Sequence, residues 1–286
     1  MRSHRLSTSI NIQPTTKDNL FDYIRSSAEF AKRKGFDALD FAFCIPNITD
    51  EGWERYVECA LSASDEFGIK YEVCHLPFSG KIALDPSLIP EFNIKVHNGI
   101  DAAAMLGAKY AVVHPNTTTL KRKQYSEKDE FESVVNHIAP FVEHAERVGV
   151  NIVVENMRPV PQIYPYHRFC QEPDELCSVV DKLGVGVCWD FGHANLAGFR
   201  QSEALAYLGS RVKLLHVNDN KGIDDDHLPP LYGNIDWKDA MHGLALAGYD
   251  GLFNYELHVN TIPFSLRDKF AEMAVGIAEE LMTYIV

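Results

Sequence analysis

Eight short apolar runs, each followed by a longer stretch with helical spacing, constrain the fold of this chain more than any other feature. A run such as Ile152-Val153-Val154 does not alternate with polar residues, as expected of a parallel strand that is covered on both faces. Eight strand and helix units within 286 residues predict a single (β/α)8 TIM barrel over residues 1–286. The predicted strands are Leu6–Ile12, Ala38–Phe43, Tyr71–His75, Tyr110–His114, Asn151–Glu155, Val185–Asp190, Lys213–Val217 and Leu252–Leu257.

The helical stretches begin and end at residues that suit helix termini. Thr16 can cap the first helix, which carries an apolar stripe and has Lys32–Lys34 at its negative end. Glycine readily adopts the left-handed conformation that ends many helices. The predicted stops are Gly35, Gly68, Gly107, Gly149, Gly184 and Gly248. No predicted strand is followed by a GxGxxG or phosphate-loop pattern, so a doubly wound nucleotide-binding sheet has little support.

Charge and composition narrow the partners and the compartment. The chain carries 27 Lys and Arg against 40 Asp and Glu, a formal charge of −13, which argues against a nucleic-acid partner. No apolar run has the length of a signal peptide or a membrane span, so we expect a cytoplasmic protein without membrane contact. The six cysteines lack CxxC spacing and are predicted to be buried, reduced thiols.

The predicted strands repeatedly end in residues that bind metals or transfer protons. The carboxyl ends of barrel strands surround one mouth, where active sites of this fold are built. One such residue alone is more often structural than functional. Several carboxylates in one mouth repel each other unless protons or a cation neutralise them. The residues at these strand ends are His75, His114, Glu155, Asp190, His216 and Glu256.

Three further candidates lie just beyond the sixth and seventh strands. His193 follows Asp190 by three residues, and Asp225 and His227 lie in the polar loop that follows His216. The run Asp224-Asp225-Asp226 alternatively forms only a solvated acidic loop. The donor set is oxygen and imidazole without thiolate, which suits a divalent metal such as Mn²⁺, Mg²⁺, Co²⁺, Fe²⁺ or Zn²⁺.

Several segments resemble the xylose isomerase-like barrels, which include sugar isomerases and epimerases and the endonuclease IV type of abasic-site nuclease. The resemblance spans nearly the whole chain. It is carried by the segments Val153–Met157, Val187–Gly198, Leu215–Asp219 and Tyr255–Leu257. The segment Pro229–Trp237 is similar to a Gly-x-Gly-x-Ile-Asp-Trp segment of the sugar enzymes, with Leu231 in place of the first glycine.

The resemblance to the ketose epimerases implies one divalent metal and a sugar substrate. It implies that Glu155, Asp190, His216 and Glu256 hold the metal and that His193 touches substrate. Glu155 and Glu256 would then act as acid and base on opposite sides of the substrate, through an enediolate. The resemblance to endonuclease IV implies additional zinc ligands in a three-metal cluster: His75, His114, His193, Asp225 and His227.

Three functions follow from these observations. The first is a metal-dependent isomerase or epimerase of a ketose or sugar phosphate. The second is a multi-zinc phosphodiester hydrolase of the endonuclease IV type. The third is a carbohydrate-binding barrel without catalysis. Metal stoichiometry, cleavage of an abasic duplex, and sugar binding without proton exchange distinguish them. The sequence does not indicate the oligomeric state.

Overall fold

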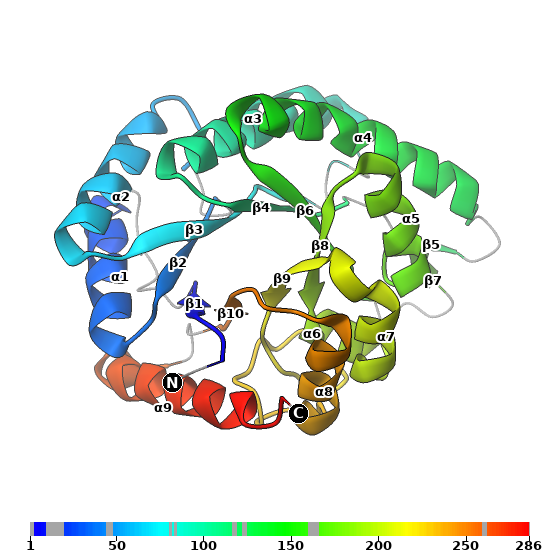
Figure 1. The fold of residues 1–286 in the computed structure, drawn as a ribbon. Helices are drawn as coiled ribbons and strands as arrows, with labels where there is room; N and C mark the ends of the chain where they lie inside the picture. Colours follow the sequence, from blue (N-terminus) through cyan, green and yellow to red (C-terminus); the bar gives the residue numbers. More distant parts are fainter. Residues whose placement is uncertain are drawn as a thin grey trace.

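The fold is a ring of parallel strands inside a ring of helices (Figure 1). The computed structural model describes residues 3–9, 20–43, 48–79, 82, 85–115, 119–121, 125–159, 166–258 and 262–285. Its main sheet has eight strands in the order β10-β1-β2-β3-β4-β6-β8-β9, and every neighbouring pair is parallel. A parallel bridge between Val217 and Tyr255 joins the β9 and β10 edges. The predicted (β/α)8 barrel is therefore confirmed.

The strands match the predicted apolar runs closely. The predicted first strand extends to Ile12, but residues 10–12 lie outside the described part of the chain. The strands of the main sheet are β1 (Leu6–Thr8), β2 (Ala38–Ala42), β3 (Lys70–His75), β4 (Tyr110–Val113), β6 (Asn151–Glu155), β8 (Gly186–Asp190), β9 (Val212–His216) and β10 (Phe253–Tyr255).

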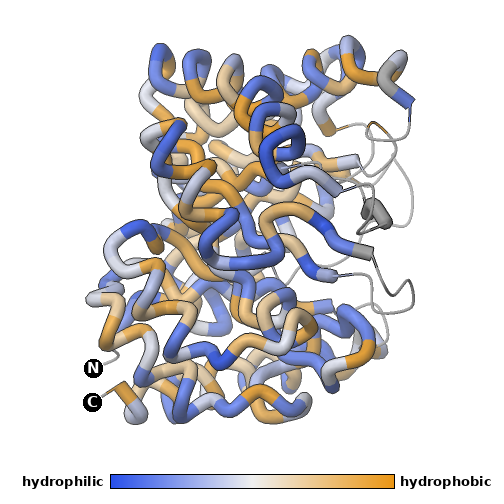
Figure 2. Tube along the Cα trace, turned by 90° about the vertical axis from the view of Figure 1, so that its right-hand side faces the viewer, coloured by the Kyte–Doolittle hydropathy of each residue, from blue (hydrophilic) through white to orange (hydrophobic). Residues whose placement is uncertain are grey.

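Helices connect the strands and cover the outside of the sheet. The helices are α1 (Leu20–Lys34), α2 (Glu54–Phe67), α3 (Ile89–Leu106), α4 (Glu127–Val148), α5 (Pro173–Leu183), α6 (Phe191–Ala197), α7 (Gln201–Leu208), α8 (Trp237–Ala247) and α9 (Arg267–Met282), with 3-10 turns at Pro86–Leu88, Gly209–Arg211 and Phe264–Leu266. Hydrophilic and hydrophobic residues are interspersed along the outer helices (Figure 2), as in amphipathic helices packed on a sheet. None of the described helices is long and apolar enough to span a bilayer.

Every glycine that the sequence predicts as a helix stop has a positive φ. The values run from 63° at Gly68 to 88° at Gly35. This conformation lets the glycine N–H donate to a carbonyl of the last turn, as Gly68 does to Ser64 over 2.9 Å. The predicted cap Thr16 lies outside the described residues. The prediction of one domain over residues 1–286 stays a prediction.

A small antiparallel sheet, which the sequence analysis did not predict, accompanies the barrel. It pairs β5 (Thr119–Lys121) with β7 (Tyr166–Arg168), so that Arg168 lies opposite Thr119. These strands leave the barrel after β4 and β6, on the side where the parallel strands end. The small sheet therefore belongs to the same end of the barrel as the predicted site.

The core has an outer layer and an inner layer. The outer layer packs between strands and helices and holds most of the buried apolar residues. The inner layer lies inside the barrel and consists of Val73, Val112, Val153, Cys188 and Leu214. The five described cysteines form no disulfide, as predicted; four of them are buried, whereas Cys59 is only partly buried, and Cys44 is outside the described residues.

Candidate metal centre

The inner core layer determines where the predicted site residues point. Side chains of a strand alternate between its two faces, so the residue two positions after an inward residue also faces inward. Val153 faces the barrel interior, and Glu155 follows it by two positions. The same spacing holds for the other strands that contribute to the inner layer. The pairs are Val73 and His75, Val112 and His114, Cys188 and Asp190, and Leu214 and His216.

Glu155, Asp190, His216 and Glu256 form the centre of the site. One ligand atom from each lies within 4.8 Å of those of the others. Nδ1 of His216 is 3.3 Å from Oε1 of Glu155 and 3.3 Å from Oε2 of Glu256. Glu155, Asp190 and His216 are almost completely buried, whereas the side chain of Glu256 is 23% exposed and lies towards the opening.

Two histidines lie on the other side of Glu155. Nε2 of His114 is 3.0 Å from Oε2 of Glu155, and Nε2 of His75 is 3.5 Å from the same oxygen. One ligand atom from each of these three residues lies within 4.8 Å of those of the other two, so the three could share an ion. They come from three adjacent strands, β3, β4 and β6, whose ends meet in the parallel sheet.

His193, Asp225 and His227 form a third group at the mouth. Nε2 of His193 is 3.4 Å from Oδ2 of Asp225, and Nε2 of His227 is 3.4 Å from Oδ1. Nδ1 of His193 is 3.3 Å from Oε1 of Glu155, so this group adjoins the centre. The structure thus brings all the predicted site residues together; within the Asp224–Asp226 run, Asp225 is partly buried beside the two histidines, whereas Asp224 is exposed.

Backbone carbonyls fix the orientation of three of the imidazoles. Nδ1 of His75, His193 and His227 lies within 2.9 Å of the carbonyl oxygens of Leu76, Asn156 and Glu256, respectively. A carbonyl oxygen only accepts, so each Nδ1 must donate a proton to it. In the neutral ring, Nε2 then keeps its lone pair and faces the cluster. Contacts of this kind commonly orient metal-binding histidines.

Asparagine side chains hold Asp190 in place. The Asp190 carboxylate accepts from Nδ2 of Asn218 at 2.7 Å and from the amide of His193 at 2.6 Å. The carboxamide of Asn156 donates to the Asp190 carbonyl at 3.0 Å and accepts from its amide at 2.7 Å. Asp190 is therefore rigidly oriented, and its carboxylate also caps α6.

Several buried polar atoms of the cluster lack a hydrogen-bond partner within the described chain. Such atoms are rare in folded proteins because each loses its interactions with water. Their concentration on facing imidazoles and carboxylates suits a cation, which accepts a lone pair from a carboxylate oxygen or from one nitrogen of each neutral imidazole. The atoms are Nε2 of His114, Oε2 of Glu155, Nδ1 and Nε2 of His216, and Oδ1 of Asp225.

Without a cation, protons must neutralise the cluster. Burial raises the pKa of Asp190 to about 6, and the neighbouring carboxylates contribute to the increase. Burial disfavours the charged form of His193, but Asp190, Asp225 and Glu155 outweigh it and raise the pKa to about 9. Glu256 and Asp225 likewise outweigh burial at His227 and raise its pKa to about 10. A bound cation would compete with these protons.

Two residues of the site escaped the sequence analysis. Cys188 has its sulfur within 4.8 Å of ligand atoms of Glu155 and His216. Burial raises the pKa of this thiol to about 12, which keeps it protonated. Asp40 of β2 is buried, accepts from Nδ2 of Asn254 at 2.9 Å, and is close enough to His216 and His75 for their charges to oppose the rise in its pKa that burial causes. Strand alternation is the signal that would have found Cys188, because it precedes Asp190 by two positions.

The loop after β9 is organised by one buried carboxylate, that of Asp219. It accepts from the amides of Leu231 at 3.0 Å and Ile235 at 3.3 Å. Leu231 has a φ of 73°, so the residue in place of the first glycine still adopts a glycine-like conformation. A Cβ atom at Gly233 would lie 2.1 Å from Oδ1 of Asp219, which explains why a glycine stands there.

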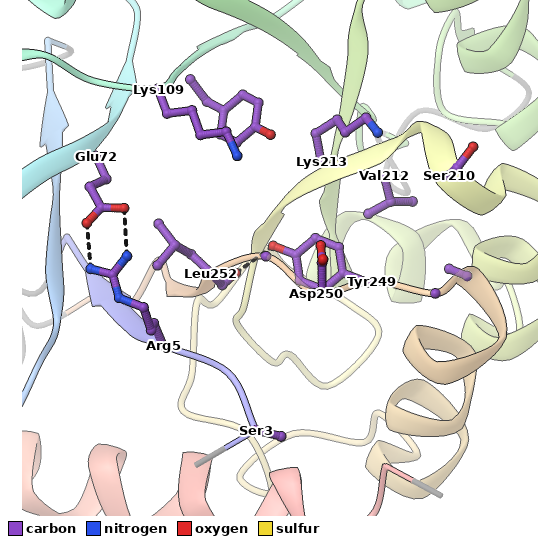
Figure 3. Close-up of a pocket in the computed structure, with 14 residues that line it drawn as sticks. Ser3, Arg5, Glu72, Lys109, Ser210, Val212, Lys213, Tyr249, Asp250 and Leu252 are labelled. Atoms are coloured by element: carbon purple, nitrogen blue, oxygen red, sulfur yellow. Dashed lines mark hydrogen bonds and ion pairs between the residues drawn. The ribbon is translucent and has the colours of Figure 1, made fainter. Parts of the chain in front are cut away.

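A cavity of about 630 Å³ lies at the opposite end of the barrel (Figure 3). It is lined by residues that precede or begin strands, such as Arg5, Lys109 and Val212. Arg5 is held by Glu72, with Nη1 and Oε2 3.0 Å apart. None of the predicted site residues lines this cavity. Active sites of this fold are built at the carboxyl ends of the strands, so we place the functional site at the His and carboxylate cluster.

The fold and the cluster define a (β/α)8 barrel protein with an acidic, imidazole-rich centre at the carboxyl ends of its strands. A model of the xylose isomerase-like TIM barrels matches residues 28–277, and the chain belongs to this family. It is 31% identical over 246 residues to the uncharacterized protein MJ1311 of Methanocaldococcus jannaschii, covering 82% of this chain and 78% of that one. It is 31% identical over 160 residues to the uncharacterized protein y4fM of Sinorhizobium fredii, covering 56% and 50%.

Solved structures with the same fold include sugar epimerases. A D-tagatose 3-epimerase-like protein superposes with a TM-score of 0.76 at 23% identity, covering 100% of this chain and 98% of that chain. A D-allulose 3-epimerase from Methylomonas sp. superposes with a TM-score of 0.74 at 15% identity, covering 97% and 98%. At these identities the likeness establishes the fold.

Proposed function

We propose that this protein is a metal-dependent isomerase or epimerase of a ketose or related sugar. The observation that carries the proposal is the buried group of Glu155, Asp190, His216 and Glu256, in which two glutamates flank one imidazole at 3.3 Å. The epimerases among the structures of similar fold support a sugar as the substrate.

These four residues would hold one divalent cation, such as Mn²⁺, Mg²⁺, Co²⁺, Fe²⁺ or Zn²⁺. Their donors are three carboxylates and one imidazole, which suits these ions. A bound cation supplies Lewis-acid polarisation of the substrate carbonyl and stabilises an enediolate. Oε2 of Glu155 and Nδ1 of His216, which lack a hydrogen-bond partner among the described residues, would serve as ligand atoms.

Glu155 and Glu256 are the candidates for proton transfer. Both carboxylates are adjacent to His216, yet they come from β6 and from the residue after β10, so they approach the centre from different strands. Asp190 differs, because its oxygens accept from the His193 amide and from Asn218. In the proposed reaction one glutamate removes the proton from carbon, and the other returns a proton.

Exchange of the carbon-bound proton with solvent tests this assignment. Wild-type protein loaded with Mn²⁺ should incorporate deuterium from D₂O into D-tagatose or a related ketose, as measured by NMR. Glu155→Gln and Glu256→Gln should each abolish incorporation. Glu279→Gln, an exposed glutamate on α9, should retain it. Retained incorporation in both site variants would refute the assignment.

A multi-zinc phosphodiester hydrolase is the second candidate. The observation in its favour is that His75 and His114 gather around Glu155, and His193 and His227 around Asp225, as two further potential ion sites. Two or three Zn²⁺ per chain, together with cleavage of an abasic duplex, would favour the hydrolase. One ion per chain without cleavage would favour the sugar enzyme. The charge of −13 argues against a DNA substrate.

A carbohydrate-binding barrel without catalysis is the third candidate. It would bind a ketose tightly and still show no incorporation of solvent deuterium into any ketose tested. The same NMR experiment, combined with calorimetric binding of the sugar, therefore separates it from the first candidate.

A further inference from the structure

Arg168 lies at the mouth of the barrel, on the small sheet of β5 and β7. Its segment runs beside the chain that follows Glu155, because the amide of Met157 donates to the carbonyl of Cys170 at 2.8 Å. Adjacent His167 points towards α5, with Nε2 2.6 Å from Oε1 of Glu175. Side chains alternate along a strand, so Arg168 points to the other side, towards the site.

A buried network fixes the segment that carries Arg168. The carboxylate of Glu175 accepts from the amide of Cys170 at 2.9 Å, from His167, and from the hydroxyl of Tyr125. Cys170 has a φ of 66°, a conformation that is uncommon for residues other than glycine. Arg168 therefore sits on a well-anchored turn.

Among the described residues, the guanidinium of Arg168 differs from that of neighbouring Arg158 in forming no direct ion pair; the carboxylates of Glu155 and Asp225 are near enough to favour its charged form but do not pair with it. Within the described residues, no carboxylate or carbonyl oxygen accepts a hydrogen bond from its side chain, although the residue is half-buried. Neighbouring Arg158, in contrast, has Nε 3.2 Å from Oδ2 of Asp225. Burial and the charge of Arg158 lower the pKa of Arg168 to about 10, so it remains charged near neutral pH.

Arg158 and Arg168 place two positive charges at the rim of a site that otherwise carries mostly carboxylates. Carboxylates dominate the centre, and the whole chain carries a charge of −13. An anionic group on the substrate would give the half-buried guanidinium of Arg168 the direct partner that it lacks among the described residues, whereas a neutral sugar would offer no charge to pair with it. A guanidinium binds phosphate or carboxylate through two parallel hydrogen bonds, and removal from water strengthens that interaction.

We infer that the substrate is an anionic sugar, whose phosphate or carboxylate group binds Arg168 while its carbonyl end lies at Glu155 and Glu256. This inference rests on the proposed function. Arg158 lies beside Arg168 and adds a second positive charge. The anionic group would sit at the end of the sugar remote from the reacting carbons, because Arg168 belongs to the rim and not to the central cluster.

A matched set of ligands tests the inference. D-Tagatose, D-tagatose 6-phosphate and D-tagaturonate share one carbon chain and carry hydroxyl, phosphate and carboxylate at carbon 6. Calorimetric titration into the full-length Mn²⁺-loaded protein should show at least tenfold tighter binding of one anionic form than of D-tagatose. Which form gains this affinity identifies the anionic group.

Variants assign the preference to Arg168. Arg168→Gln should remove the tenfold preference and change the Kd of D-tagatose less than twofold. Arg168→Lys keeps the charge without the two-pronged geometry and should retain part of the preference. It also serves as the test if the glutamine variant does not fold. The control Arg211→Gln removes an exposed arginine that pairs with Asp181 and should leave all three affinities unchanged.

Two results would overturn the inference. One is equal affinity of the wild-type protein for all three sugars. The other is an equal loss of affinity for all three in Arg168→Gln, which would mean a structural role. Because binding is read without turnover, failure of the proposed function is distinguishable. A preference for anionic sugars that depends on Arg168, without deuterium incorporation, refutes the epimerase and supports the anion site. Deuterium incorporation without any such preference supports the epimerase and refutes the anion site.

Discussion

Oδ2 of Asp219 accepts a hydrogen bond from the indole Nε1 of Trp237 at 2.9 Å, which joins two residues 18 positions apart in the chain. Trp237 begins α8, and Asp219 lies just beyond β9. The contact closes the loop that carries Asp225 and His227. The same carboxylate accepts from the backbone of that loop, so one buried side chain fixes the segment from both ends.

Asp219→Asn should destabilise the protein by about 3 kcal/mol, the cost of leaving buried donors without an acceptor. In the variant, the NH2 group of asparagine would face N–H donors, which in the wild type donate to a carboxylate oxygen of Asp219. Trp237→Phe removes one of these hydrogen bonds and should cost about 1 kcal/mol. Urea unfolding of both variants measures the difference, and equal losses would contradict this role of Asp219.

Leu231→Gly should stabilise the protein. Leu231 has a φ of 73°, and its side chain is 52% exposed, so little packing is lost. A left-handed conformation costs about 1 kcal/mol for a residue with a Cβ atom, partly offset by the greater freedom of glycine in the unfolded chain. Thermal unfolding should show a higher Tm for Leu231→Gly. Leu246→Gly, within α8, should lower the Tm and serves as the control.

The sequence predicts the barrel well because parallel strands and helices repeat with a recognisable spacing. It also predicts the central cluster, because residues at strand ends such as Glu155 and His216 converge once the barrel closes. Arg168 was not predicted, since β7 has three residues and no periodicity. Cys188 was predicted only as one of six buried thiols, although its spacing from Asp190 places it in the barrel interior beside the site.

Removal of divalent metal should lower the Tm. After the metal is removed by a chelator, the folded protein must hold the carboxylates of Glu155, Asp190 and Glu256 close together without a cation. A cation that binds the folded state and not the unfolded chain would stabilise the fold. At a hundredfold excess over Kd, a ligand stabilises by about 2.7 kcal/mol. Calorimetry with EDTA and then Mn²⁺ measures the shift. Glu256→Gln should reduce the shift and Glu279→Gln should preserve it; identical shifts would argue against the site.

A histidine pair between α3 and α4 should make stability depend on pH. Nδ1 of His97 is 2.6 Å from Nδ1 of His144, whose Nε2 is 2.6 Å from Oδ1 of Asp101. With Nε2 of a neutral His144 donating to Asp101, Nδ1 of His144 keeps its lone pair and accepts from Nδ1 of His97. Burial and His144 lower the pKa of His97 below the ordinary 6.5.

The sign follows from proton uptake. Below pH 6.5 the unfolded chain binds a proton at His97 that the folded state resists, so acid favours unfolding. His97→Gln should therefore lose less stability than the wild type between pH 7.5 and 5.5. Urea unfolding at both pH values, with saturating Mn²⁺, compares the two proteins. Parallel losses would mean that other groups dominate.

The carboxamide of Asn156 pairs with the backbone of Asp190 as a peptide group of a neighbouring strand would. The side chain of Asn156 thus adds one more pair of hydrogen bonds to the ladder between β6 and β8, just after the last residue of β6. Aspartate lacks the donor, and glutamine places both groups one carbon too far. In a library of all residues at position 156, selected only for retention of metal, asparagine should be the survivor. Such a result would mean that the backbone geometry of the barrel, and not the substrate, determines which residue is tolerated at position 156.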